Sequence, residues 1–294
     1  MSLLQRIDEL NSFDPAGFLP FMLEGECIGL VRQGFVDKLA VHDDAFTITA
    51  HAITFQQQLN TVESRTARFS SLIHELIDDG VLDYHLNEPY PVKGRRDQVF
   101  FVADRALVPY LGFRSYGQHI NGFVQKPDGM YLWIARRALD RRIFPGKLDN
   151  MVAGGLPYGL SLQQNLLKEC HEEAGMPEAL AAKARAVSAI TYNAISEKGY
   201  KPDTLYCYDI ELTEEFQPVN TDGEVDSFEL MPVEAVINKV TEGGWFKPNC
   251  NLVLIDFFAR HGLLDPQHED FLKIQQGLHV SFWYDQFEKT DKQT

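Results

Sequence analysis

The sequence predicts an α/β sandwich, in which helices pack on both faces of a mixed β-sheet, preceded by a small α+β domain. Two observations lead to this prediction. From about residue 113 onward β-rich runs alternate with amphipathic helical runs, whereas the preceding residues read as short strands around one clear helix. We therefore expect an N-terminal domain over residues 1–112 and a second domain over residues 113–294.

The N-terminal region contains one hairpin and one helix that can be identified from their patterns. Residues 18–33 hold two apolar runs separated by a Glu-Gly turn, which is typical of a β-hairpin. Residues 61–80 place apolar residues at helical spacing and finish on Gly80, a residue type that often ends helices. Residues 93–112 predict a strand followed by a turn. None of these elements shows an obvious chemical role.

In the second region strand patterns alternate with helical patterns, as expected for a sandwich with a mixed sheet. Residues 115–138 form two β-rich runs around a Lys-Pro-Asp-Gly turn, and residues 186–195 and 203–212 predict further strands. Helical patterns follow at residues 232–244 and 250–264. Helices of this kind have to bury an apolar face, and the sheet supplies the partner surface.

Composition restricts the classes of protein and of partner. Hydrophobic residues make up 45% of the 294 residues, which is enough to form a core. The formal net charge of −15 argues against nucleic-acid binding. No apolar run approaches the roughly 18 residues of a membrane span, and no secretory signal opens the sequence. The cysteines are scattered without a C-x-x-C pair, as expected for reduced thiols. We therefore expect a cytoplasmic protein with neither membrane nor nucleic-acid partners.

A helix over residues 161–174 carries the most unusual charge pattern. Ser161 suits the N-cap and Gly175 the position after the C-terminus. Glu169, Glu172 and Glu173 occupy positions i, i+3 and i+4, so their carboxylates share one face and repel one another. They also lie near the helix C-terminus, where the macrodipole disfavours anions. Such a pattern is often a solvated face, but it also suits a divalent cation.

The segment before this helix favours the cation. Residues 153–159 read Ala-Gly-Gly-Leu-Pro-Tyr-Gly, a composition that forms no regular element and lets a backbone approach a ligand closely. Lys168 can reach Glu172, but one amine cannot neutralise three acids. Mg²⁺ or Mn²⁺, which prefer carboxylate oxygens, would do so. Together the loop and the helix predict a site for a metal-bound diphosphate.

Residues 154–176 resemble a Nudix box, whose pattern is G-x5-E-x7-R-E-U-x-E-E-x-G-U with U a bulky apolar residue. Gly154 takes the first position, the acids of the helix take the clustered Glu positions, and Met176 takes the last. Two residues depart from the pattern. Leu160 replaces the early Glu, and Lys168 replaces the Arg, which keeps the charge but loses the bidentate fork. The resemblance implies a Nudix α/β/α sandwich with a mixed sheet.

The resemblance also implies a metal-dependent hydrolase of diphosphates. Glu169, Glu172 and Glu173, with the carbonyl of Gly154, would hold Mg²⁺ or Mn²⁺, and Lys168 would support the acids. A further acid often comes from a later loop in this family. Glu224 is the candidate, with Asp222 and Asp226 as alternatives, although a solvated turn would have the same composition.

The resemblance extends to a subfamily with an added N-terminal domain. Residues 152–159, 168–175, 222–236 and 246–262 are similar to members that hydrolyse thiamine diphosphate and its oxidised analogues to the monophosphates. Two alternatives remain open. One is a Nudix hydrolase of ADP-ribose, a dinucleotide or a nucleotide sugar. The other is a Nudix-like binding or regulatory module without catalysis, an interpretation that the departures at Leu160 and Lys168 would favour.

Recognition of the organic half of the substrate is assigned to aromatic and basic residues near the box. The candidates are Phe144, Lys147, Trp245, Phe246 and Lys247. Aromatic faces suit flat or cationic rings, although the aromatic residues would equally fit a core. A basic cluster at Arg136, Arg137, Arg141 and Arg142 would guide an anion or balance surface acids. The expected partners are a small diphosphate substrate and, as a candidate, a second copy in a homodimer.

Overall fold

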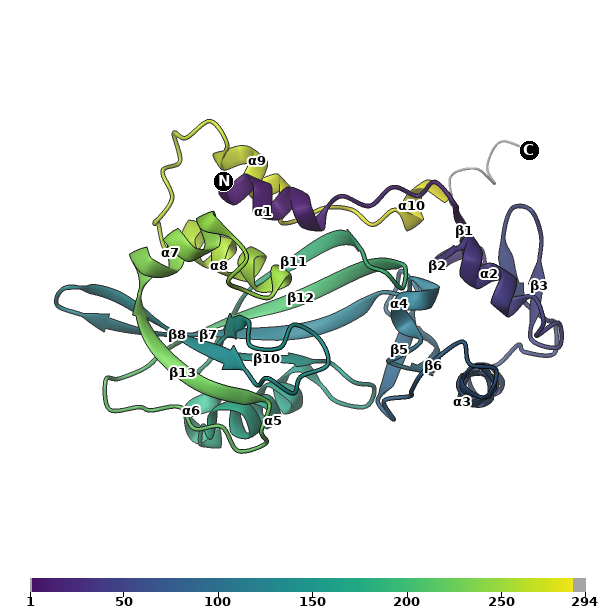
Figure 1. Cartoon of the computed structure of the whole chain (residues 1–294), viewed down its shortest axis with the longest axis horizontal. Helices are drawn as coiled ribbons and strands as arrows, with labels where there is room; N and C mark the ends of the chain where they lie inside the picture. Colours follow the sequence, from purple (N-terminus) through teal and green to yellow (C-terminus); the bar gives the residue numbers. More distant parts are fainter. Residues whose placement is uncertain (1, 288–294) are drawn as a thin grey trace.

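The computed structural model describes residues 2–287, and for Asp285 the backbone alone. Two units lie side by side along the longest axis of the molecule (Figure 1). The elements of the N-terminal unit are β1 (Phe18–Leu23), β2 (Glu26–Arg32), α2 (Gln33–Leu39), β3 (Phe46–Ile48), β4 (Ile53–Phe55), α3 (Val62–Asp78), β5 (Pro89–Lys93), β6 (Val99–Asp104) and α4 (Val108–Leu111).

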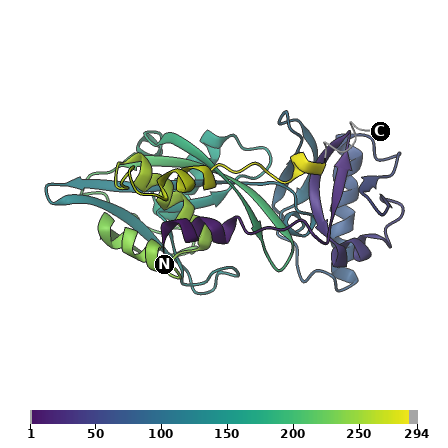
Figure 2. The ribbon, with the colours of Figure 1, turned by 90° about the horizontal axis from the view of Figure 1, so that it is seen from above.

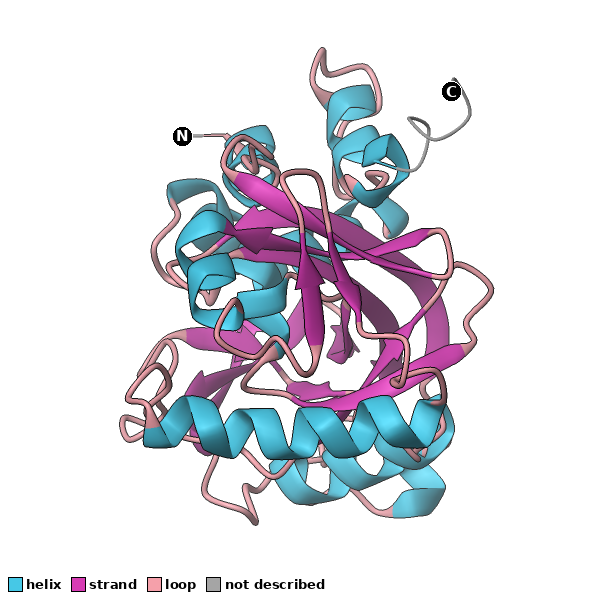
Figure 3. Ribbon diagram, turned by 90° about the vertical axis from the view of Figure 1, so that its right-hand side faces the viewer, coloured by secondary structure: helices cyan, strands magenta, loops and turns pink. Residues whose placement is uncertain are grey.

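The N-terminal unit is built around a sheet of order β2-β1-β4-β3 and a separate hairpin of β5 and β6. Helix α3, which Figure 3 shows lengthwise, begins at a capping box between Thr61 and Ser64. Its apolar face packs into an aromatic core in which Phe21, Phe69 and Phe101 have no exposed surface. The predicted hairpin and helix are therefore both present.

The second unit contains the larger sheet. Its elements are β7 (Ser115–Lys126), β8 (Gly129–Arg137), β9 (Leu148–Asn150), β10 (Val152–Gly155), α5 (Leu162–Ala174), α6 (Glu178–Ala181), β11 (Arg185–Ile195), β12 (Tyr200–Glu211), β13 (Val225–Pro232), α7 (Val233–Glu242), α8 (Pro248–Arg260) and α9 (Phe271–Gly277). The strand order is β11-β12-β7-β8-β13, with β10 paired to β7 and β9 to β8. Only β7 and β12 among these pairs run parallel, so the sheet is mixed as predicted.

Helices cover both faces of this sheet. Helices α5 and α6 lie on one face, and α7 and α8 lie on the other (Figure 1). Helix α8 is buried along most of its length because it packs between the sheet and further helices. The predicted α/β/α sandwich is confirmed, and β13 is a strand that the sequence patterns did not identify.

The two ends of the chain cross between the units. Helix α1 (Leu3–Leu10) packs against α8 and α9 of the second unit, where Ile7 is 1% exposed. Helix α10 (Tyr284–Phe287) returns to β2 of the N-terminal unit. Figures 1 and 2 show both crossings. A division into residues 1–112 and 113–294 therefore does not describe the ends, because their apolar faces are buried by the other unit.

Candidate functional site

Helix α5 and strand β10 bring the acidic residues and the preceding glycines together. Ser161 and Gln164 form a reciprocal capping box at the start of α5. At the other end, Gly175 has a φ of 59°, and a Cβ there would lie 2.8 Å from the Val219 carbonyl oxygen. Both ends of α5 are therefore fixed by the residues that the sequence indicated.

Lys168 bridges two carboxylates of α5. Its Nζ lies 3.2 Å from Oε1 of Glu169 and 2.7 Å from Oε2 of Glu172. Burial opposes the charge on Lys168, but the two carboxylates outweigh it and raise the pKa of the amine to about 12. The lysine therefore remains charged and reduces the repulsion between its two neighbours.

Glu173 is more enclosed and has a different partner. The residue is 7% exposed, and its Oε2 accepts a 2.8 Å hydrogen bond from the Ala153 N–H on β10. Burial raises the pKa of Glu173 well above its usual range, against the opposing effect of that hydrogen bond. Within residues 2–287 no cation forms an ion pair with this carboxylate, so its negative charge is poorly compensated.

Glu169 lies against the glycine that opens the box. A Cβ at Gly154 would overlap the Glu169 carboxyl group, so only glycine lets that carboxyl group reach the strand. Burial raises the pKa of Glu169, although Lys168 works in the opposite direction. The expectation that residues 153–159 form no regular element is wrong for residues 153–155, which belong to β10 because they pair with β7. This glycine-rich strand is in direct contact with the acidic helix.

The cluster fits a hard divalent cation. It offers carboxylate oxygens, the ligand type that Mg²⁺ and Mn²⁺ prefer. Burial penalises the charges of Glu169 and Glu173, and Lys168 is the one ion-pair partner that these acids of α5 have in the described part of the chain. A bound cation would supply the missing positive charge.

Glu224, in the turn before β13, is electrostatically linked to α5. Its carboxylate is 2.6 Å from Arg141, and its charge contributes to the raised pKa values of Glu169 and Glu173. The rival acids have local roles: Asp222 accepts a 2.8 Å hydrogen bond from the Glu224 N–H, and Asp226 accepts one from Ser227. Of the candidates in this loop, Glu224 has the clearest connection to the site.

The residues predicted to contact the organic half of the substrate lie in different environments. Phe246 is 2% exposed and belongs to the core that packs against α8. Trp245 and Phe144 are each 41% exposed. Lys147 donates a hydrogen bond to the carbonyl oxygen of Gly244. The structure therefore places Phe246 where a core residue would be and leaves Phe144 and Trp245 at the surface.

Lys247 lies over a buried polar cluster that the sequence patterns did not reveal. Asp149 is 3.0 Å from Arg137 and 3.4 Å from Lys247, and it accepts a 2.7 Å hydrogen bond from the Cys250 thiol. Burial opposes ionisation of Asp149, but Lys247, His119, Cys250 and Arg137 outweigh it and lower its pKa. His119, Asp149 and Cys250 offer ligand atoms within 4.8 Å of one another. The cations that pair with Asp149 make this a hydrogen-bonded cluster instead of a metal site.

A second buried carboxylate lies on the same face of the sheet as α8. Oδ2 of Asp203 accepts hydrogen bonds from Tyr192 and Lys201, whereas its buried Oδ1 has no partner in the described part of the protein. Tyr192 on β11 and Asp203 on β12 are paired across neighbouring strands, so no local motif marks this site in the sequence. The alternation of side chains along the strands is the one sequence signal that could have indicated it.

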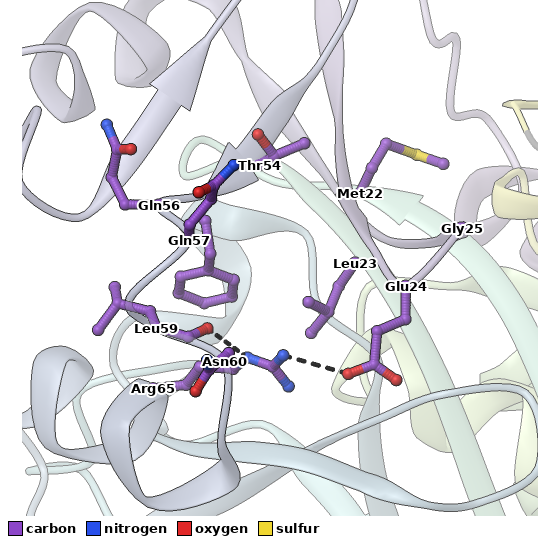
Figure 4. Close-up of a pocket in the computed structure, with 11 residues that line it drawn as sticks. Met22, Leu23, Glu24, Gly25, Thr54, Gln56, Gln57, Leu59, Asn60 and Arg65 are labelled. Atoms are coloured by element: carbon purple, nitrogen blue, oxygen red, sulfur yellow. Dashed lines mark hydrogen bonds and ion pairs between the residues drawn. The ribbon is translucent and has the colours of Figure 1, made fainter.

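Two surface hollows lie away from the acidic helix. One, of about 280 Å³, is in the N-terminal unit, where Arg65 donates to the Leu59 carbonyl oxygen and pairs with Glu24 (Figure 4). The other, of about 370 Å³, lies at the end of α8 beside Arg260 and His261. Neither is lined by an acid of α5, so the chemistry of the residues locates the candidate site better than the size of a hollow.

Comparisons with known proteins agree with the geometry of α5 and β10. The NUDIX domain family model matches residues 116–249, and a domain of unknown function, DUF4743, matches residues 2–115. Nudix hydrolase 24, chloroplastic, of Arabidopsis thaliana is 40% identical over 94% of this chain and 77% of its own length. Nudix hydrolase 20, chloroplastic, of the same plant is 41% identical over 89% and 72%.

The chain belongs to the Nudix hydrolase family, and it is a hydrolase that acts on diphosphate bonds. Within the family, the chain is similar to relatives that combine this hydrolase domain with the same kind of N-terminal domain, as predicted. Among solved structures, the NUDIX domain of Shewanella oneidensis NrtR complexed with ADP ribose is 14% identical, with a TM-score of 0.39 over 51% of this chain and 89% of that one.

The predicted cytoplasmic location is wrong on this comparison. The two plant relatives are named as chloroplastic proteins. Scattered reduced cysteines and acidic composition do not distinguish two reducing compartments, which is why the prediction failed. Within residues 2–287, no helix is long and apolar enough to cross a membrane.

Proposed function

We propose that this protein uses Mg²⁺ or Mn²⁺ to hydrolyse a small diphosphate to the monophosphate. The observation that carries the proposal is the contact of α5 with β10, where Glu169 lies on Gly154 and Glu173 accepts the Ala153 N–H. Bound there, the cation would neutralise diphosphate oxygens and lower the pKa of an attacking water.

The chain supplies the ligands and the residues that orient them. Glu169, Glu172 and Glu173 would hold the cation, and Lys168 keeps two of these carboxylates close together. The supporting main-chain group is proposed to be the carbonyl of Ala153 instead of that of Gly154. The Ala153 N–H points to α5, and in a strand the N–H and C=O of one residue face the same side while those of the next face the other.

Thiamine diphosphate or an oxidised analogue is the proposed substrate. This choice rests first on the resemblance to the thiamine diphosphate-hydrolysing subfamily. It is supported by the unpartnered Oδ1 of Asp203, because an amino group or a cationic ring would satisfy a buried carboxylate oxygen. Tyr192, whose hydroxyl donates a hydrogen bond to Asp203, would be an aromatic partner for such a ring.

Nudix hydrolysis of ADP-ribose, a dinucleotide or a nucleotide sugar is the second candidate. The cationic residues Lys247 and Arg137 beside Asp149 favour it, since they would suit an additional anionic group. A binding module without catalysis is the third candidate, and only Leu160 and Lys168 favour it. The intact carboxylates of α5 favour an enzyme.

The test is product analysis with a panel of diphosphates. Purified full-length protein is incubated with thiamine diphosphate, its oxo and oxy analogues, ADP-ribose, a dinucleotide and a nucleotide sugar, with and without Mg²⁺. We expect metal-dependent formation of a thiamine monophosphate species with the highest kcat/KM. A higher kcat/KM for a nucleotide would overturn the substrate, and the absence of hydrolysis throughout would overturn the enzyme.

A further inference from the structure

The hairpin of β5 and β6 in the N-terminal domain is fixed to the loop that follows β10. The Tyr158 N–H donates a 2.8 Å hydrogen bond to the Pro89 carbonyl oxygen, and the Tyr90 hydroxyl donates one of 3.2 Å to that of Tyr116. A Cβ at Gly155 would overlap the Tyr90 hydroxyl. Tyr90 of the N-terminal domain therefore fills the space that a side chain at Gly155 would need, just as Glu169 fills the space beside Gly154.

The N-terminal domain also reaches the loop that carries Arg141. Tyr84 lies under Arg142, whose Cζ is 3.5 Å from the centre of the ring. The Tyr84 hydroxyl accepts a 2.8 Å hydrogen bond from Lys198, which comes from the turn between β11 and β12. The domain thus contacts the second unit on two sides of the proposed active site, beside β10 and beside the loop between β8 and β9, whose Arg141 pairs with Glu224.

Arg105, directly after β6, is held in place at this junction. One guanidinium nitrogen is 2.8 Å from the Glu88 carboxylate, and the Arg105 N–H donates a 2.9 Å hydrogen bond to the Glu88 carbonyl oxygen. Its Cζ lies 5.7 Å from the centre of the Tyr90 ring. In the described part of the molecule, Nε and Nη2 have no hydrogen-bond partner, and 46% of the side chain is exposed. The Arg105 guanidinium is therefore oriented by Glu88, and its Nε and Nη2 can still donate hydrogen bonds to a ligand.

The charges around the acidic helix show what Arg105 adds. Lys168 is already paired with two acids and Arg141 with Glu224, so the charges of these two cations of the second domain are already compensated. A Cβ at Gly155 would lie 3.4 Å from Oε1 of Glu88, the carboxylate that pairs with Arg105, so the guanidinium is held beside β10. A diphosphate brings several negative charges, and a guanidinium matches phosphate oxygens with two parallel hydrogen bonds.

We propose that the N-terminal domain completes the active site and that Arg105 binds the phosphates of the substrate from the side opposite α5. This inference rests on the proposed function, since it assumes that a diphosphate occupies the site. It assigns to the domain of unknown function a direct role in substrate binding. Glu88 and Tyr90 act as positioning residues, because they hold Arg105 and fix the hairpin to β10.

The test compares Arg105→Gln and Arg105→Lys with a matched control, Arg96→Gln, in the full-length protein. Arg96 lies in the turn of the same hairpin, is exposed, and its side chain has no partner within residues 2–287. For the diphosphate that the unmodified protein hydrolyses best, we expect Arg105→Gln to raise KM on the order of 10- to 100-fold. Arg105→Lys should give an intermediate KM, and Arg96→Gln should leave KM unchanged.

Inhibition by the monophosphate product gives a second readout that a purely structural role would not change. We expect its inhibition constant to rise in parallel with KM in Arg105→Gln, while the melting temperature stays close to that of the control. Unchanged KM and inhibition constants in both Arg105 variants would overturn the role of Arg105 while leaving the proposed function intact. If the unmodified protein hydrolyses no diphosphate, the proposed function itself fails.

Discussion

Glu173 differs from the other acids of α5 in its surroundings, and this difference can be tested with one substitution. It is buried, bonded to the Ala153 N–H, and has no ion pair within residues 2–287. We expect Glu173→Gln to lower kcat by roughly 10²- to 10³-fold, because an amide cannot replace a charged metal ligand. Folding should be retained, since Gln still accepts the Ala153 hydrogen bond.

The measurement is steady-state hydrolysis together with the circular dichroism spectrum. Glu178→Gln is the control, because Glu178 is exposed on the neighbouring α6 and outside the cluster. Full activity of Glu173→Gln would show that this carboxylate is not needed for hydrolysis. A loss of folded signal in that variant, with Glu178→Gln intact, would show a structural role instead.

Lys168 stands where the family pattern has an arginine, so its contribution can be separated into charge and geometry. We expect Lys168→Met to lower kcat/KM by about 10-fold, because Glu169 and Glu172 would repel each other without the bridging charge. Lys168→Arg should keep or improve activity, since its fork can contact both carboxylates. Kinetics at several Mg²⁺ concentrations would check this, and equal activity of all three proteins would contradict it.

His119 gives the protein a predictable response to pH. Burial, with a contribution from Lys247, lowers its pKa to about 4, compared with an ordinary value near 6.5. As the pH falls from 6.5 to 4, the unfolded chain takes up a proton that the folded chain does not. The free energy of unfolding therefore decreases over this range by up to roughly 3 kcal/mol, and the contribution is complete above pH 6.5.

Urea unfolding at pH 7 and pH 4.5 measures this effect. We expect His119→Gln to lose much of the pH dependence in that interval, whatever its stability at pH 7. His51→Gln is the control, because His51 is exposed. An identical slope in His119→Gln and the unmodified protein would contradict the assignment.

At the scale of elements, β10 is the strand on which both units converge. Its Gly154 faces the acidic helix, and its Gly155 faces the Tyr90 hydroxyl. We expect Gly155→Ala to lower the free energy of unfolding by about 1–3 kcal/mol, because the new methyl group would overlap that hydroxyl. Adding Tyr90→Phe should recover part of the loss by removing the overlapping atom.

Thermal or urea unfolding of the single and double variants measures this contact. Gly34→Ala serves as the control, because a Cβ at Gly34 meets nothing within 4 Å and lies in helix α2. It should be neutral or slightly stabilising. Equal stability of Gly155→Ala and the unmodified protein would mean that the Tyr90 hydroxyl leaves room for a methyl group at position 155.

Local signals explain how much of these elements could be predicted from the sequence. Ser161 and Gly175 marked both ends of α5, and the spacing of Lys168 from Glu172 predicted their contact. Arg105 could not be identified in the same way. It reaches the site only because a hairpin docks on β10, and no periodicity records a contact between distant segments.

At the scale of the whole molecule, the crossing of the chain ends ties the two units together. Ile7 of α1 is buried against α9, where a Cβ at Gly277 would overlap it. We expect Ile7→Ala to lower the free energy of unfolding by about 2–5 kcal/mol through the cavity it leaves. Leu272→Ala, at a 71% exposed position of α9, should change it little.

Circular dichroism during thermal unfolding follows both units at once. We expect one transition, shifted to lower temperature in Ile7→Ala. Two separate transitions, or an unshifted one, would show that α1 does not hold the units together. The sequence could not reveal the crossing of the chain ends. The apolar stripe of α1 predicts that one face is buried, but it does not indicate the surface against which that face packs.

The same crossing makes folding depend on contacts between segments that lie far apart along the chain. Helix α1 precedes its partners α8 and α9 by more than two hundred residues. Helix α10 packs back onto β2, which also lies more than two hundred residues earlier. Contacts between segments so far apart carry a high loop-closure entropy, so we expect them to slow folding and to make each unit reach its final form together with the other.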